Sequence, residues 1–200
     1  TSRAQKDVSE LRTWKMDIRQ VISDNMVKDM LAEVDGRWFE AVDDALVGVG
    51  ITLPTSGTVQ YQAIDGGIDR NSIVDSLKVT PSTPFSIDTA TCVVNHITIL
   101  DVAKWGRDEV GGDIAQKMFR DGIVEETMFG RKWIATIKKT LVLTNHQYMF
   151  GAVDFIGKAC ELEPTTMYIR REAFMMEFFA YREIGASIGH TGALGHVVYQ

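Results

Sequence analysis

The sequence predicts an α+β protein, and three observations lead to this fold class. Residues 8–47 contain no proline and repeat apolar side chains at three- or four-residue steps, as a long amphipathic helix does. Short segments rich in Val, Thr and aromatic residues follow between turn signals and predict strands. Residues 166–188 carry apolar side chains on both alternations, which predicts one long strand covered on both faces.

The long helix is expected to begin near Ser9 and to end at Gly48 and Gly50, which free the backbone from helical dihedrals. Asp35 and Gly36 mark the point where it would be interrupted. At about 1.5 Å per residue, such a helix would be roughly 40 to 60 Å long. Because that length exceeds what one small core covers, we expect part of the apolar stripe to contact another element or another subunit.

The rest of the chain mixes strand and helix signals before it turns to strands alone. Asn95 fits the N-cap of a helix that passes Trp105 and ends near Gly106. In chain order, the other expected elements are short strands and turns at 51–62, a turn at 65–67, a helix at 70–79, a loop at 80–84, a buried strand at 91–94, a short helix at 113–119, and a meander of strands at 133–137, 141–143 and 147–150.

Composition limits the classes of function. The chain has 200 residues, of which 45% are hydrophobic, enough for a sizeable core. Its 27 acids and 21 bases give a net charge of -6, which predicts no general attraction to nucleic acid or to an anionic membrane. No apolar run reaches the roughly 18 residues that span a bilayer. We therefore expect a soluble protein made in a reducing cytosol, and, because the chain starts at Thr1 without Met or a signal pattern, a processed or truncated piece of a longer protein.

The residues that most often ligate metals form no recognised pattern. Cys92 and Cys160 lie far apart and outside any CxxC spacing, so they are predicted to be two buried thiols. None of the histidines, which are His96, His146, His190 and His196, belongs to an HExxH motif. The glycine-punctuated tail at 189–196 leaves two interpretations open: a metal or anion site, or a flexible or interface-forming tail.

Other catalytic patterns are incomplete. Residues 151–158 end like a Walker A loop, but the spacing is wrong and Ala159 replaces the magnesium-binding hydroxyl. The adjacent acids at 43–44 and 125–126 point to different sides of their elements, as on a solvated face. We therefore predict no catalytic residue, no cofactor-binding residue, no metal ligand and no enzymatic function. The aromatic run at 174–181 is either intrachain core or partly an intersubunit contact.

Four short segments carry a resemblance to a known family. Residues 43–48 end the long helix at a glycine, and residues 91–95 lead from a strand into an asparagine-capped helix. Residues 128–134 look like a strand entry, and residues 150–155 like a phenylalanine-glycine-aspartate turn with two inserted residues. With the order of elements, they resemble the major capsid proteins of tailed double-stranded DNA phages, whose Hong Kong 97-type fold is shared with encapsulin shells.

The resemblance implies a long spine helix, a discontinuous peripheral domain at 1–68 and 165–183, and a mixed α/β axial domain at 69–164 and 184–200. It implies a structural subunit of an icosahedral bacteriophage or prophage capsid. Such subunits assemble with themselves into hexamers and pentamers that enclose DNA, in the host bacterial cytoplasm, with scaffolding and portal proteins as further partners. The N-terminal arm and extended loop that family members carry before the spine helix would be incomplete here.

Two alternatives to a viral capsid stay open. The same fold resemblance implies an encapsulin-like nanocompartment shell. A small-molecule enzyme would instead bring its site together only in three dimensions, as a deep pocket lined by perturbed ionisable groups with His96 or His146 among them.

Overall fold

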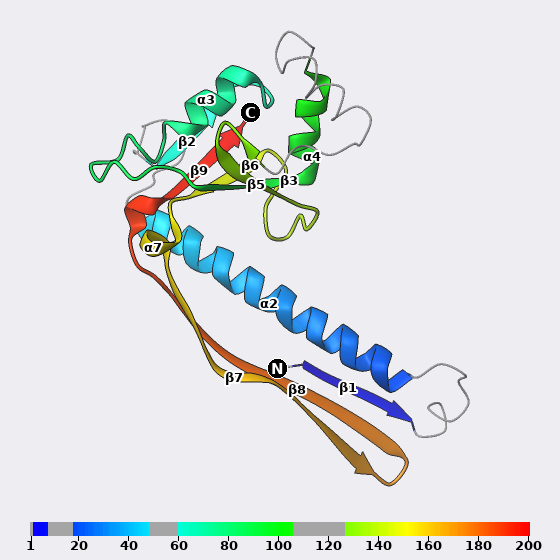
Figure 1. Ribbon diagram of the computed structural model, residues 1–200. Helices are drawn as coiled ribbons and strands as arrows, with labels where there is room; N and C mark the ends of the chain where they lie inside the picture. The colour runs from blue at the N-terminus through cyan, green and yellow to red at the C-terminus, as the bar shows by residue number, and fades with distance from the viewer. Residues whose placement is uncertain (1, 8–17, 49–59, 106–126) are drawn as a thin grey trace. The chain divides into compact units, whose positions relative to one another are not determined.

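The computed structural model describes residues 2–7, 18–48, 60–105 and 127–200, with the elements labelled in Figure 1. The chain divides into two compact units. The first consists of Thr1–Glu40 with Lys158–Ser187, and the second of Ala41–Gly157 with Ile188–Gln200. Both units contain helix and strand, so the predicted α+β class is confirmed. The elements expected at 51–59 and 113–119 lie outside the described residues.

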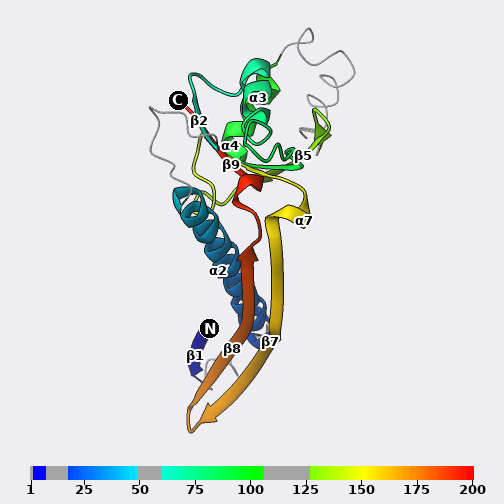
Figure 2. The same ribbon diagram turned by 90° about the vertical axis from the view of Figure 1, so that its left-hand side faces the viewer.

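The first unit contains a three-stranded sheet with the order β1-β8-β7. Its strands are β1 (Ser2–Asp7), β7 (Gly157–Glu172) and β8 (Met175–Ile188). β1 runs antiparallel to β8, with Ser2 opposite Ala180. Figure 2 shows β7 and β8 side by side as a long hairpin.

Helix α2 (Ile18–Gly48) covers one face of this sheet with its first-unit residues. Met26 and Met30, one helical turn apart, form a buried cluster with Phe178 and Ala180 of β8. Phe178 and Ala180 are two residues apart on a strand, so both point to the helix. The apolar stripe therefore contacts another element, as predicted.

The predicted interruption of the helix is wrong, because α2 continues through Asp35 and Gly36. A glycine weakens a helix without breaking it, and no proline is present to remove a backbone hydrogen bond. An ion pair between Glu33 and Arg37, at 3.7 Å, spans the glycine by joining neighbouring turns. The predicted start of the helix at 8–17 lies outside the described residues.

The second unit contains a six-stranded mixed sheet with the order β2-β9-β6-β3-β5-β4. The pairs β2–β9 and β3–β5 are parallel, and the remaining neighbours are antiparallel. The strands are β2 (Tyr61–Ile64), β3 (Thr91–Asn95), β4 (Thr127–Met128), β5 (Arg131–Thr136), β6 (His146–Phe150) and β9 (Leu194–Tyr199).

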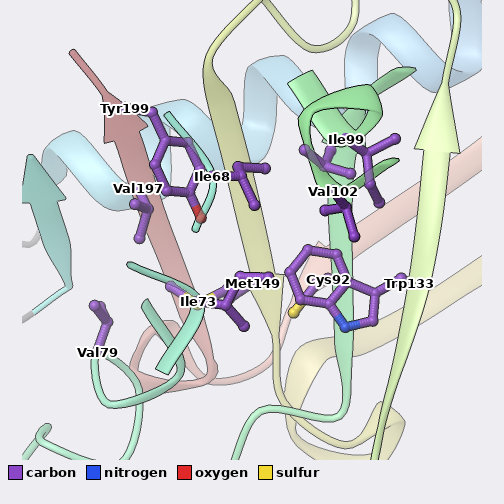
Figure 3. Packing of buried hydrophobic residues seen from close by; sticks show 11 residues of the cluster. Ile68, Ile73, Val79, Cys92, Ile99, Val102, Trp133, Met149, Val197 and Tyr199 are labelled. Carbon is purple, nitrogen blue, oxygen red and sulfur yellow. The ribbon is translucent and has the colours of Figure 1, made fainter. Parts of the chain in front are cut away.

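One face of this sheet carries the main core. Side chains of alternate strand residues meet those of α3 (Arg70–Leu77), α4 (His96–Ile99) and the 3-10 helix η1 (Leu100–Lys104). Figure 3 shows them pointing toward one another. The cluster consists of Ile68, Ile73, Val79, Cys92, Val94, Ile99, Val102, Trp133, Met149, Val197 and Tyr199. Its polar atoms are paired, since the Trp133 indole donates to the Met128 carbonyl at 3.2 Å and the Tyr199 hydroxyl to Gln147 at 2.5 Å.

Local signals placed two helix starts correctly. The side chain of Asn95 accepts a hydrogen bond from the Ile97 amide at 2.9 Å, which confirms the predicted N-cap. Asp69 and Ser72 form a reciprocal capping box at the start of α3. The predicted strands at 91–94, 133–137 and 147–150 correspond to β3, β5 and β6.

The predicted strand at 141–143 is wrong, because residues 139–142 form a turn and a bend, and none of the residues 137–145 belongs to a strand. The amides of Leu141 and Val142 both donate to the carbonyl of Lys138, which closes the chain on itself. Val142 is nevertheless fully buried, and its carbonyl accepts from the Asn95 side-chain amide at 2.7 Å. Its apolar character therefore anchors a loop and does not indicate a strand.

The predicted single strand over 166–188 is also wrong. The chain reverses at Ala173 and Phe174, where Ala173 has a φ of 40°, and the two halves pair as the β7–β8 hairpin. Apolar residues alternate in the strands on both sides of such a turn, so the alternation alone did not reveal where the turn lies.

Two smaller predictions also need correction. Cys92 is buried as predicted, but Cys160 is exposed on β7. The tail at 189–196 is not an irregular segment, because the 3-10 helix η2 (Thr191–Ala193) leads directly into β9, which lies between β2 and β6.

Candidate functional site

The tip of the β7–β8 hairpin is the most exposed apolar part of the described first unit. The turn places Phe174 outward with 80% of its surface exposed. Leu162, Tyr168, Ile169 and Met175 of the same hairpin are also exposed. Aromatic and methionine side chains are enriched in protein interfaces, so the neighbouring Phe174 and Met175 at this tip are candidates for contact with another molecule.

The sheet face opposite α2 is held in place by contacts within the chain. Arg3 donates to Glu177 at 2.6 Å, and its guanidinium lies 5.4 Å from the ring centre of Phe179. The rings of Tyr168 and Tyr181 stack at 5.8 Å. Hydrogen bonds, first from Arg3, hold the pKa of Glu177 below its usual range. These side chains are ordered before any partner binds, which lowers the entropy cost of an interface.

The second unit exposes a separate set of apolar side chains. Ile137 and Val153 are exposed to 80% and 78%. Val153 begins the short helix α7 (Val153–Ile156), and Phe155 on this helix is also exposed. These residues occupy loops and a short helix at the sheet margins, where side chains reach solvent without disturbing the core.

A cavity of about 370 Å³ lies beside α7. It is lined by Phe85, Ser86, Ile87, Asp88, Ala152, Phe155 and His190. Its ionisable groups are already bonded within the chain: Asp88 pairs with Arg131 at 2.5 Å, and His190 Nδ1 accepts from the Gly192 amide at 3.0 Å. Because the walls are mostly apolar and these polar groups already have partners, the cavity suits the binding of an apolar side chain better than catalysis.

The ionisable residues that could have favoured an enzyme lie elsewhere. Neither His96 nor His146 lines this cavity. His96 is exposed at the start of α4, whereas His146 pairs with His196 on the sheet. The sequence had grouped His196 with His190, its neighbour in the tail, and missed the pair with His146, because only the β6–β9 register joins residues so far apart.

Cys92 is not a nucleophile. Burial in the core raises the pKa of its thiol to about 12, so the thiol stays neutral at physiological pH. Among the described residues, no group of three or more His, Cys, Asp or Glu side chains could hold a metal ion. No helix in those ranges is both long and apolar enough to cross a membrane.

Solved structures share this architecture over essentially the whole chain. A chain of Mycobacterium phage Che8 matches with a TM-score of 0.70 and 12% identity, covering 100% of this chain and 69% of its own. The capsid of an empty GTA particle matches with a TM-score of 0.64 and 12% identity, covering 99% of this chain and 71% of its own. A virus-like particle from Pyrococcus furiosus matches with a TM-score of 0.57 and 12% identity, covering 98% of this chain and 75% of its own. No protein-family model and no curated protein matches the chain.

The fold predicted from the sequence resemblance is therefore confirmed. The chain has the Hong Kong 97-type fold, with the long helix α2 and the β7–β8 hairpin as its most recognisable elements.

Proposed function

We propose that this chain is a structural subunit of an icosahedral capsid of the tailed-phage type. The observation that carries the proposal is the full-length structural similarity to a phage protein and to the capsid of a GTA particle. The site of function would be the virion capsid, assembled in the host bacterial cytoplasm.

Assembly would proceed through packing alone. Each subunit offers exposed apolar groups in both units, with Phe174 and Val153 as the largest single exposures of the hairpin and of α7. Symmetry repeats each modest interface many times, so a stable shell needs no covalent chemistry. Under this proposal the subunits would form hexamers and pentamers that enclose DNA, with scaffolding and portal proteins as additional partners.

The two-domain division belongs to the same proposal. The peripheral domain would comprise residues 1–68 and 165–183, and the axial domain residues 69–164 and 184–200. The presence of two compact units supports a division into two domains. The boundaries between the units lie after residues 40, 157 and 187 and therefore differ from the proposed domain boundaries.

A nanocompartment shell is the second candidate, and the match to the Pyrococcus furiosus virus-like particle favours it. The contents of purified particles distinguish the two. DNA inside the particle, or terminase and portal genes beside the coding gene, would support the capsid, and an enclosed enzyme would support the compartment.

Negative-stain electron microscopy of the full-length product tests the proposal. We expect particles of uniform size, and we expect Phe174→Asp to reduce their yield at least tenfold, because a buried carboxylate without a partner costs several kcal/mol per interface. Thr165→Asp adds the same charge at an exposed position of β7 and is the matched control. A full-length product that stays monomeric at high concentration would refute the proposal.

A further inference from the structure

Two histidines that are 50 residues apart in sequence meet in the sheet of the second unit. His146 Nδ1 lies 2.9 Å from His196 Nε2. The register explains the contact: His146 is opposite Val198 and Tyr148 is opposite His196, so all three polar side chains share the face opposite the main core.

Charged and aromatic groups surround the pair from each neighbouring element. From β6, the ring of Tyr148 stacks on that of His196, with the ring centres 4.5 Å apart and the ring planes at 3°. From β2, the ring of Tyr61 meets that of His196 edge-on, with the ring centres 5.4 Å apart. From the end of α2, Asp43 accepts the Tyr148 hydroxyl at 2.9 Å, and Asp44 is its neighbour. Val42 and Leu46 of the same helix end are buried within this unit.

The contact allows at most one extra proton. A neutral imidazole has one N–H and one bare nitrogen, so one ring must donate to the other across the 2.9 Å gap. When one ring is protonated the bond persists as a charge-assisted one. When both are protonated, both facing nitrogens carry hydrogen and the bond is lost, leaving two cations with ring centres 5.0 Å apart.

The surroundings decide which ring is charged first. The Asp43 carboxylate is near His146 and favours its protonated form, although burial still lowers the pKa of His146. Burial and then the charge of His146 lower the pKa of His196 to about 4. The stack on Tyr148 favours a cation, but burial still keeps the pKa of His196 lowered.

We propose that the His146–His196 pair is an acid-sensitive contact: it joins β6 and β9 beneath the end of α2 while at most one imidazole is protonated, and it breaks when both are. Breaking it loosens the sheet face from which Tyr148 donates its hydrogen bond to Asp43. The contact lies within one unit of one chain, so it does not depend on the proposed capsid function, and unassembled protein suffices to test it.

The direction of the pH dependence follows from proton binding. In the unfolded chain both histidines titrate at about pH 6.5. Below that pH the unfolded state binds more protons than the folded one, so stability falls as pH decreases, by up to about tenfold in the unfolding constant per pH unit for each proton. Asp43 has the opposite effect on stability, because burial raises the pKa of its carboxyl group in the folded state. This effect is confined to the pH range in which the carboxyl group itself titrates.

Imidazole nitrogen NMR spectra of the wild-type protein between pH 4 and pH 8 give the direct test. We expect His146 and His196 to titrate below the ordinary histidine value of about 6.5, and their N–H···N coupling to disappear in acid. If both titrate at or above about pH 6.5, or if no coupling is found at pH 8, the proposal is overturned. This measurement requires no variant and is therefore independent of any folding defect.

Variants add a second test through urea unfolding as a function of pH. His196→Gln keeps a hydrogen-bonding side chain but removes one titrating group, so we expect the pH dependence between about 6.5 and 4 to flatten by up to tenfold in the unfolding constant per pH unit. His96→Gln, at an exposed position, should keep the wild-type profile. A wild-type profile in His196→Gln would also overturn the proposal.

Discussion

The two units of this protein bury their apolar residues in different ways. The second unit surrounds one face of a six-stranded sheet with helices and buries a large cluster around Met149 and Trp133. The first unit has three strands, two of them 16 and 14 residues long, and one helix face, and its buried cluster among the described residues is Met26, Met30, Phe178 and Ala180. Because this cluster is small, the first unit depends more on polar contacts within its sheet, such as the hydrogen bond from Arg3 to Glu177.

The largest expected effect is in the core of the second unit. Trp133→Ala should lower the free energy of unfolding by about 3–5 kcal/mol, because the loss of a buried aromatic ring leaves a cavity. Urea unfolding measures the change. Ile134→Ala, next along β5 but with its side chain 42% exposed, should cost about 1 kcal/mol or less. Equal losses for the two variants would contradict the idea of a one-sided core.

A core substitution in the first unit should act locally. Phe178→Ala should cost about 3 kcal/mol and speed amide hydrogen exchange in β7, β8 and residues 18–40. Peptides from β3, β6 and β9 should keep their protection, because their core has no member in the first unit. If protection falls equally in both units, the two units unfold together and their buried clusters are not independent.

The attachment of β1 should depend on pH through Glu177. Because its pKa is lowered in the folded state, chiefly by Arg3, this carboxyl contributes stability above its ordinary pKa, and the contribution is lost as pH falls through the lowered value. The protection factors of the amides in residues 2–7, which compare the measured exchange rate with the intrinsic rate at the same pH, should therefore fall several-fold in acid. Glu177→Gln should show fast exchange already at pH 7, whereas Glu183→Gln, at an exposed position of β8, should not.

The smallest expected effect compares one glycine from each unit. Gly36→Ala should stabilise the protein by about 0.5–1 kcal/mol, since it lies inside α2 and nothing lies within 4 Å of the added methyl group. Gly66→Ala has equal space but a φ of 97°, so it should destabilise by about 1–2 kcal/mol. Thermal unfolding distinguishes the signs, and a stabilising Gly66→Ala would show that backbone strain is not limiting there.

Much of the secondary structure could be predicted because its signals are local. The period of α2, the cap at Asn95 and the apolar strand around Cys92 depend on residues within a few positions of one another. The order of these elements was enough to indicate the Hong Kong 97-type fold. The same local signals failed at Val142, where burial comes from a loop, and at Ala173, where a turn divides a continuous apolar pattern.

The tertiary structure alone decided which distant residues meet. The exposure of Cys160 follows from its place on β7 of a three-stranded sheet, and the pairing of His146 with His196 follows from the register of β6 against β9. A strand's own sequence specifies which side chains share a face but not which strand lies beside it. That choice depends on the packing of the whole unit, and therefore the sequence determined the elements while the fold determined the contacts.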